Sequence, residues 1–114
     1  MNSIDELRLR LRAFADARDW EQFHAPKNLA AALIVEAGEL LEHFQWLSER
    51  QSRTLDEQTR SAVALEMADV LLYLVRLADQ LGIDLIEAAN RKITLNERKY
   101  PAHEVRGRSD KRHT

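Results

Sequence analysis

The chain has 114 residues, of which 45% are hydrophobic and 32% are charged, the balance of a soluble globular protein with a single domain. It contains no cysteine, which excludes disulfide bonds and thiolate metal sites. The net charge of −2 hides an asymmetry, because residues 1–90 are acidic overall whereas residues 91–114 carry eight basic and three acidic side chains.

The sequence favours helices throughout. Only 3 glycines and 2 prolines interrupt it, and no long stretch alternates polar and apolar residues with the period of a strand. We therefore expect an all-α, four-helix domain that spans residues 1–114. The first helix is predicted to begin at a capping box formed by Ser3 and Glu6 and to run to about Arg18.

The second helix follows an irregular segment over residues 19–27, in which Pro26 breaks the apolar pattern. Asn28 is the residue expected to cap this helix, which then continues to about Leu47. Residues 48–54 are polar and are predicted to form a connection without regular structure.

The third helix is predicted to begin at a second capping box, Thr54 with Glu57, and to run to Leu81, where Gly82 ends it. Nearly every residue over 62–78 is apolar, which indicates a helix buried on most of its sides. A single chain of this length has little material to cover such a helix, so we expect a homo-oligomer.

The fourth helix is predicted to begin after Asp84, with Glu87 completing its cap, and to reach about Lys99 before Pro101. Residues 102–114 are polar and are expected to form a flexible basic tail. Apolar runs are short, and near the start of the chain they are interrupted by arginines. The sequence therefore predicts neither a signal peptide nor a membrane span, and we expect a cytoplasmic protein.

Two pairs of acidic residues lie on the second and third predicted helices. Glu36 and Glu39 form one pair and Glu66 and Asp69 the other, and each pair projects from one helical face because its members are three residues apart. If the two helices face each other, four carboxylates meet and repel one another unless a cation binds. Oxygen ligands favour Mg²⁺, Mn²⁺ or Ca²⁺ over zinc or copper, and we expect Mg²⁺, with Mn²⁺ able to replace it.

A solvated polar stripe is the alternative explanation for both pairs, because an amphipathic helix needs such a stripe. Solvated stripes usually mix charges of both signs, yet residues 28–49 contain four acids and no Lys or Arg, and residues 61–75 contain two acids and no base. The charge pattern therefore favours a metal site. The Glu-x-x-His motif of di-iron bundles is absent, since His43 lies four residues after Glu39.

The chain resembles the MazG-like all-α nucleoside triphosphate pyrophosphohydrolases, and most of all their dCTP pyrophosphatase branch. The resemblance is carried by the E-x-x-E and E-x-x-D pairs and by the segments RDWEQFHAPKNL, EAGELLEHFQW and DVLLYLVRLA, followed by Lys92, Asn96, Tyr100 and Pro101. It implies Mg²⁺-dependent cleavage of a deoxynucleoside triphosphate to the monophosphate and pyrophosphate. It also implies a homotetramer built as a dimer of dimers.

The resemblance also implies roles for individual residues. Glu36, Glu39, Glu66 and Asp69 would bind the metal. Apart from the resemblance, we expect Glu36 to orient or deprotonate the attacking water, and Asn28 and Arg98 to add contacts to the substrate. The residues expected to contact the substrate are Trp20, His24, Asn28, Trp46, Tyr73, Lys92, Asn96, Arg98 and Tyr100. Those up to residue 73 are expected around the base and sugar, with Asn28 primarily a helix cap, and those from residue 92 onward around the phosphates.

Three functions are consistent with the sequence. The expected one is removal of dCTP or modified pyrimidine nucleotides from the nucleotide pool, although Leu11 stands where some relatives carry a polar base-contacting residue, which leaves the preferred base open. A related enzyme acting on dUTP or phosphoribosyl-ATP would carry the same acidic pairs. The third is a non-catalytic helical oligomer that binds nucleic acid through its basic tail, but this tail lacks interleaved aromatic residues.

Overall fold

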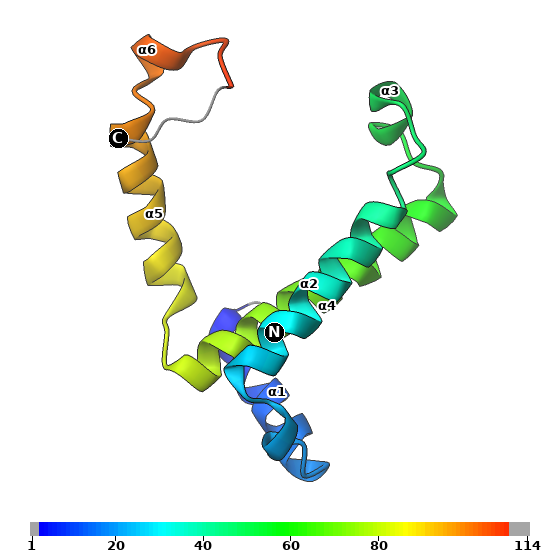
Figure 1. The fold of residues 1–114 in the computed structure, drawn as a ribbon, viewed down its shortest axis with the longest axis vertical. Helices are drawn as coiled ribbons and strands as arrows, with labels where there is room; N and C mark the ends of the chain where they lie inside the picture. The colour runs from blue at the N-terminus through cyan, green and yellow to red at the C-terminus, as the bar shows by residue number, and fades with distance from the viewer. Residues whose placement is uncertain (1–2, 110–114) are drawn as a thin grey trace. The chain divides into compact units, whose positions relative to one another are not determined.

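The computed structural model describes residues 3–109, and all regular structure in that range is helical (Figure 1). The chain divides into two compact units, the first ending at Gly82 and the second beginning at Ile83, and each is described by itself. Within the described range, no helix combines the length and the apolar character needed to cross a membrane. The all-α fold class is therefore confirmed.

The chain begins with helix α1 (Ile4–Ala17), which starts where the sequence predicts. The side chain of Ser3 accepts a hydrogen bond from the backbone N–H of Glu6 at 3.1 Å. After α1 the chain reverses through Asp19, whose φ of 53° is a left-handed conformation that aspartate tolerates better than most residues. A short 3₁₀ helix, η1 (Glu21–Phe23), then occupies the segment predicted to be irregular.

Helix α2 (Pro26–Glu42) starts earlier than predicted, so the assignment of Asn28 as its cap is wrong. Ala25 is the N-cap and Pro26 takes the first helical position, where its fixed φ fits and its missing N–H is not needed. The side-chain amide of Asn28 instead donates a hydrogen bond to the backbone oxygen of Phe23 at 3.3 Å. Asn28 therefore stabilises the turn that precedes α2.

The predicted end of this helix at Leu47 is also wrong, because α2 ends at Glu42 and the chain continues in tight turns. The connection predicted to lack structure contains a one-turn helix, α3 (Glu49–Ser52). Ser48 and Gln51 form a capping box around its start, since each side chain bonds the backbone N–H of the other. This local pairing is why a polar segment is helical.

Helix α4 (Glu57–Leu81) is the longest element. Its N-cap is Asp56, whose carboxylate accepts a hydrogen bond from the N–H of Thr59 at 2.7 Å, so the predicted cap at Thr54 is wrong. Its end is confirmed: Gly82 adopts a left-handed φ of 66°, which glycine reaches without steric cost.

The second unit contains helix α5 (Leu85–Lys99), which begins and ends where predicted. Asp84 caps it by accepting a hydrogen bond from the N–H of Glu87 at 3.0 Å. The region predicted to be a flexible tail contains a further short helix, α6 (Ala102–Val105), and residues 110–114 lie outside the described residues.

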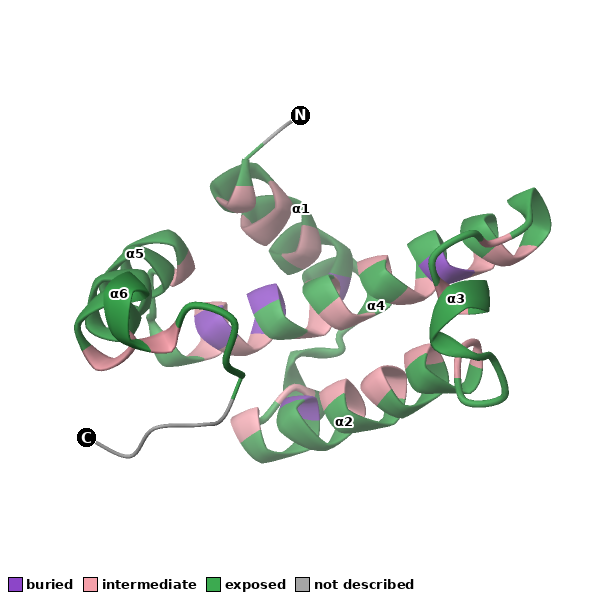
Figure 2. Ribbon diagram, turned by 90° about the horizontal axis from the view of Figure 1, so that it is seen from above, coloured by how far each residue is buried: buried purple, intermediate pink, exposed green. Residues whose placement is uncertain are grey.

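In the first unit, α2 and α4 pack along each other and α1 packs against α4 (Figures 1 and 2). The buried apolar core is small and consists of Ala15, Leu29, Val63, Val75 and Ala78. Large apolar side chains stay exposed on α2 and α4, and Leu65, in the segment predicted to be buried, is 71% exposed. The prediction that α4 is buried on most of its sides is therefore not met within a single chain.

Candidate metal centre and adjoining cavity

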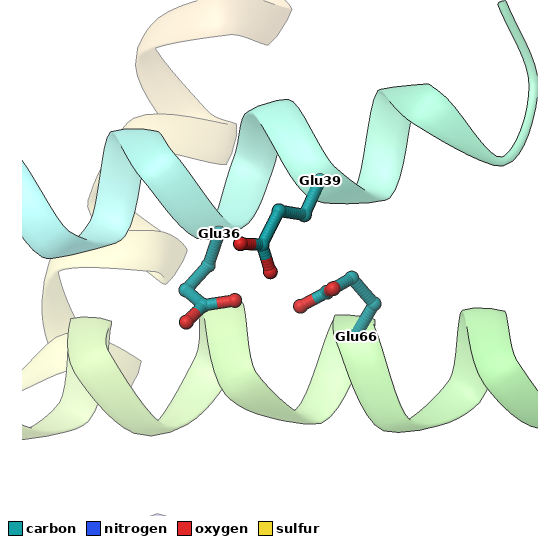
Figure 3. A group of neighbouring side chains, drawn as sticks. All are labelled: Glu36, Glu39 and Glu66. Carbon is teal, nitrogen blue, oxygen red and sulfur yellow. The ribbon is translucent and has the colours of Figure 1, made fainter.

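Three of the four predicted carboxylates converge between α2 and α4 (Figure 3). Glu36 and Glu39 lie one turn apart on α2, and Glu66 faces them from α4, so that one oxygen of each lies within 4.8 Å of the others. The three-residue spacing on α2 creates this arrangement because it places both side chains on the face that packs against α4. Asp69 lies outside the group, one turn further along α4.

The carboxylate cluster consists of Glu36 and Glu66, which are half-buried, and Glu39, which is exposed. In the part of the chain that the structure describes, Oε2 of Glu36 and Oε2 of Glu66 are buried without a hydrogen-bond partner. Buried polar atoms in native proteins are nearly always satisfied, by protein groups, ordered water or ions. The orphaned oxygens therefore fit the requirements of a bound cation, and an all-oxygen donor set suits a hard divalent ion.

Crowding of these carboxyls also changes their acidity. The neighbouring Glu36 carboxyl, followed by burial and Glu39, raises the pKa of Glu66 to about 7. Glu66 lowers the pKa of Glu36, but burial and Glu39 outweigh that effect, so the pKa of Glu36 is raised overall. Near neutral pH Glu66 is therefore partly protonated, and a cation would have to compete with that proton.

A cavity of about 180 Å³ adjoins the cluster on the side of Asp69, whose charge contributes to the raised pKa of Glu36. Aromatic rings form one wall: Phe14 meets Trp20 edge-on with ring centroids 5.6 Å apart, and Trp20 meets His24 at 6.3 Å. The lining residues are Leu11, Phe14, Ala15, Trp20, His24, Asp69, Leu72, Tyr73 and Arg76. An aromatic slot beside an anionic cluster suits a ligand with a flat ring and a charged end that binds through a metal.

Arg76 is a charged residue of the cavity lining that was not among the predicted site residues. Its side chain is buried, with 4% of the residue exposed. Its Nε donates a hydrogen bond to Nδ1 of His24 at 3.0 Å, and its terminal nitrogens pair with Glu21 and, at 3.2 Å, with Asp79. The sequence does contain one indication of this role: Arg76 is a single arginine in an apolar stretch of helix. Such an arginine is buried with the helix and therefore needs buried partners.

Asp79 connects this network to α1. Its side chain is 6% exposed and accepts hydrogen bonds from Arg12 at 2.5 Å and from Arg8 at 3.4 Å. The bond from Arg12 is the main cause of the lowered pKa of Asp79, and it outweighs the opposing effect of burial. Together with Arg76 these contacts join α1, η1 and α4 around the cavity.

Two of the predicted substrate contacts in the first unit, Trp46 and Asn28, do not line the cavity. Trp46 follows α2 and is 87% exposed, and Asn28 is exposed and bonded to the preceding turn. The remaining predicted residues belong to the second unit, within α5 or directly after it: Lys92, Asn96, Arg98 and Tyr100. Trp20, His24 and Tyr73 do line the cavity, as does Asp69. The roles in binding and catalysis assigned to all these residues stay predictions.

Comparison with known proteins gives consistent matches. A sequence model described as the MazG-like family matches residues 32–113. The chain is 42% identical over 111 residues to dCTP pyrophosphatase 1 from Homo sapiens and 42% identical over 107 residues to the Mus musculus protein of that name. These matches cover 96% and 92% of this chain but only 65% and 63% of the relatives, so the chain spans less than two thirds of their length.

The fold is also shared with a solved structure. The crystal structure of a pyrophosphatase from Archaeoglobus fulgidus matches with a TM-score of 0.81 and 47% sequence identity. The match covers 85% of this chain and 91% of that chain. At this identity the two chains share both fold and ancestry.

Proposed function

This chain belongs to the MazG-like family, and on that premise we propose that it is a Mg²⁺-dependent nucleotide pyrophosphohydrolase. Its substrate would be a deoxynucleoside triphosphate, with dCTP or a modified pyrimidine nucleotide preferred, and its products the monophosphate and pyrophosphate. The observation that carries the proposal is the carboxylate cluster with its two orphaned buried oxygens, next to an aromatic cavity. The names of the relatives, dCTP pyrophosphatase 1, support the choice of nucleotide.

Glu36, Glu39 and Glu66 are the residues that would hold the metal, with Asp69 as a fourth ligand from the cavity side. When bound, Mg²⁺ would offset the charge of the triphosphate and of the leaving pyrophosphate, and Mn²⁺ would do the same. A set of carboxylates repels a free triphosphate, so the anion would bind only together with the cation. The same carboxylates would repel any anion that is not bound to a divalent cation.

Glu36 is the residue we assign to the water. Its carboxylate would take a proton from a water molecule whose oxygen bonds to the α-phosphorus, while the bond from that phosphorus to the bridging oxygen of the β-phosphate breaks. The nucleoside monophosphate and pyrophosphate would then leave.

The other predicted residues would place the two ends of the nucleotide. Trp20, His24 and Tyr73 in the cavity wall are proposed to surround the base and sugar, as is Trp46. Asn28 is proposed to contribute at most indirectly, through the turn that it stabilises. The residues proposed to hold the phosphates are Lys92, Asn96, Arg98 and Tyr100.

The exposed apolar surface supports assembly. Ile34 on α2 and Leu65 on α4 are each 71% exposed, an arrangement that costs free energy in water and is relieved when another copy covers it. We propose a homotetramer built as a dimer of dimers, acting in the cytoplasm on the free nucleotide pool to remove unwanted nucleotides.

The decisive experiment is pyrophosphate release from a panel of canonical and modified nucleoside triphosphates, with Mg²⁺ and with EDTA. We expect turnover that requires the metal and is highest for dCTP or a modified relative. A preference for dUTP or phosphoribosyl-ATP would keep the reaction class and replace the substrate. No turnover on any nucleotide would overturn the proposal, and salt-dependent binding of nucleic acid in that case would support a non-catalytic protein.

A further inference from the structure

Arg76 and His24 both line the cavity and are joined by one hydrogen bond, in which Nε of Arg76 donates to Nδ1 of His24 at 3.0 Å. Arginine stays protonated and has no acceptor, so Nδ1 of the imidazole must offer a lone pair to it. The proton of the neutral ring therefore sits on Nε2. We propose that Arg76 is a positioning residue that fixes His24 as a hydrogen-bond donor, through Nε2, to an acceptor atom of the nucleobase in the cavity.

The orientation of Arg76 is itself fixed. Its guanidinium is buried and bonds three groups at once: His24 on η1's C-terminal side, Glu21 within η1, and Asp79 one turn along α4. Arg12 from α1 holds Asp79 in place at 2.5 Å. A planar fork with three partners has one rotamer available, so the donor that faces His24 cannot turn away without breaking the others.

The environment also keeps His24 neutral. Protonation of Nδ1 would set its N–H against an N–H of Arg76, two donors with no acceptor between them. Burial, followed by the charge of Arg76, lowers the pKa of His24, and Glu21 only partly opposes this. Nε2 forms no hydrogen bond to the described residues, so its proton is left for a ligand.

The chemistry of the cavity selects the ligand atom. Around His24 the wall is mainly aromatic and aliphatic, with Trp20, Phe14 and Leu72, which suits the faces of a nucleobase. A single neutral N–H matches one acceptor on the edge of that base, a carbonyl oxygen or an unprotonated ring nitrogen. The phosphates belong instead at the carboxylate cluster, since their charge requires the cation. The nucleobase identity rests on the proposed function, whereas the state of the imidazole does not.

The protonation state of the imidazole can be read directly by NMR on the ¹⁵N-labelled chain, from the coupling pattern of the His24 ring nitrogens. We expect Nε2 protonated and Nδ1 unprotonated at pH 7. Arg76→Met should release His24 into a mixture of ring states. Arg60→Met, the control that removes an exposed arginine of α4 outside the network, should leave the ring state unchanged. A proton on Nδ1 in the native protein, or no change in Arg76→Met, would overturn the positioning role.

Turnover of dCTP tests the contact with the base. His24→Leu should raise KM about tenfold with kcat nearly unchanged, the loss expected for one hydrogen bond to a bound ligand. His24→Gln places an amide near Nε2 and should restore KM to within about threefold of the native value, whereas His24→Asn places its amide near Nδ1 and should not. Equal KM values in all three variants would overturn the contact with the base.

Failure of the Arg76→Met variant to fold and failure of the proposed function can each be distinguished from failure of the positioning role. If Arg76→Met does not fold, as judged by circular dichroism, Arg76→Lys replaces it, and the ring state of the native protein alone is sufficient to refute the arrangement. A native protein that hydrolyses no nucleotide would overturn the proposed function. The NMR result would then still decide whether Arg76 sets the state of His24.

Discussion

The raised pKa of Glu66 predicts that metal binding depends steeply on pH. A cation must displace the proton that Glu66 holds with a pKa of about 7, so the apparent affinity falls as the pH drops below that value. With one competing proton, the factor by which affinity is reduced is close to one at pH 8 and about ten at pH 6. We therefore expect the dissociation constant for Mn²⁺, measured by isothermal titration calorimetry, to rise about tenfold over that interval.

Glu66→Gln isolates the cause. The amide has neither the negative charge nor the titratable proton of the carboxyl. Because an anionic ligand is lost, the variant should bind Mn²⁺ at least about tenfold more weakly at pH 8, and it should lose turnover while keeping its fold. Glu42→Gln is the matched control, because Glu42 is an exposed acid on α2 outside the carboxylate cluster. Affinity in the native protein that is the same at pH 6 and pH 8, or full turnover in Glu66→Gln, would refute the metal-site interpretation.

The same shift predicts a stability effect in the metal-free protein. The pKa of Glu66 in the folded chain lies above its ordinary value of 4.5, so between pH 4.5 and about 7 the folded state binds more protons than the unfolded state. The contribution of this carboxyl to stability is therefore complete below that window and is lost as the pH rises through it. Thermal unfolding of native protein and Glu66→Gln in EDTA, from pH 5 to 8, should show this decline in the native protein and a smaller one in the variant.

Three further predictions concern the stability of the first unit and the binding of the base. Asp79→Asn should lower the free energy of unfolding, measured by urea titration, by about 3 kcal/mol, because it removes one of the two carboxylates that pair with the buried Arg76. A loss below about 1 kcal/mol would show that Glu21 alone is a sufficient partner. Gly82→Ala should lower the free energy of unfolding by about 1 kcal/mol, because alanine is strained at a left-handed φ of 66° even though no atom lies within 4 Å of the added carbon. An unchanged free energy of unfolding would mean that the C-terminus of α4 rearranges. Trp46→Ala should raise KM for the nucleotide and leave Mn²⁺ affinity unchanged, and an equal loss of both would contradict a role in binding the base.

The carboxylate cluster could be predicted because it depends on local geometry. Glu36 and Glu39 share a face of α2 by their spacing alone, and the absence of basic neighbours marked that face as unusual. The exact set could not be predicted in the same way. Asp69 shares the face of Glu66 in sequence but lines the cavity, because the direction of a side chain depends on the packing of the facing helix as well as on its register.

The errors at helix ends have a similar origin. Asn28, Thr54 and Asp56 are all acceptable caps by type, and the sequence alone does not rank caps that lie a few residues apart. At α2 the deciding factor is Pro26, whose preference for the first helical turn outweighs an asparagine two positions later. The cap at Asp56 depends on its bond to the N–H of Thr59, which is visible only once the backbone is placed.

The network around Arg76 could not be predicted from the sequence, because its partners are far apart along the chain. The hydrogen bonds of Arg76 span 52 residues to His24 and 55 to Glu21, and that of Arg12 spans 67 to Asp79. Periodicity places an arginine on one face of its helix but does not say which carboxylate or ring it meets. A buried arginine in an apolar helix is nevertheless a sign that such partners exist, since an isolated buried charge is too costly to persist.

The distribution of charge sets a condition on how a triphosphate can bind. The carboxylate cluster in the first unit has no basic member, so it attracts phosphates only through a cation, whereas Lys92 and Arg98 lie on α5 in the second unit. A triphosphate carries about four negative charges, more than one divalent cation neutralises. Under the proposed function, the remaining positive charge would have to come from a second cation or from basic side chains such as these. Large apolar side chains are exposed on both α4 and α5, and covering them with further copies of the chain would remove apolar surface from water.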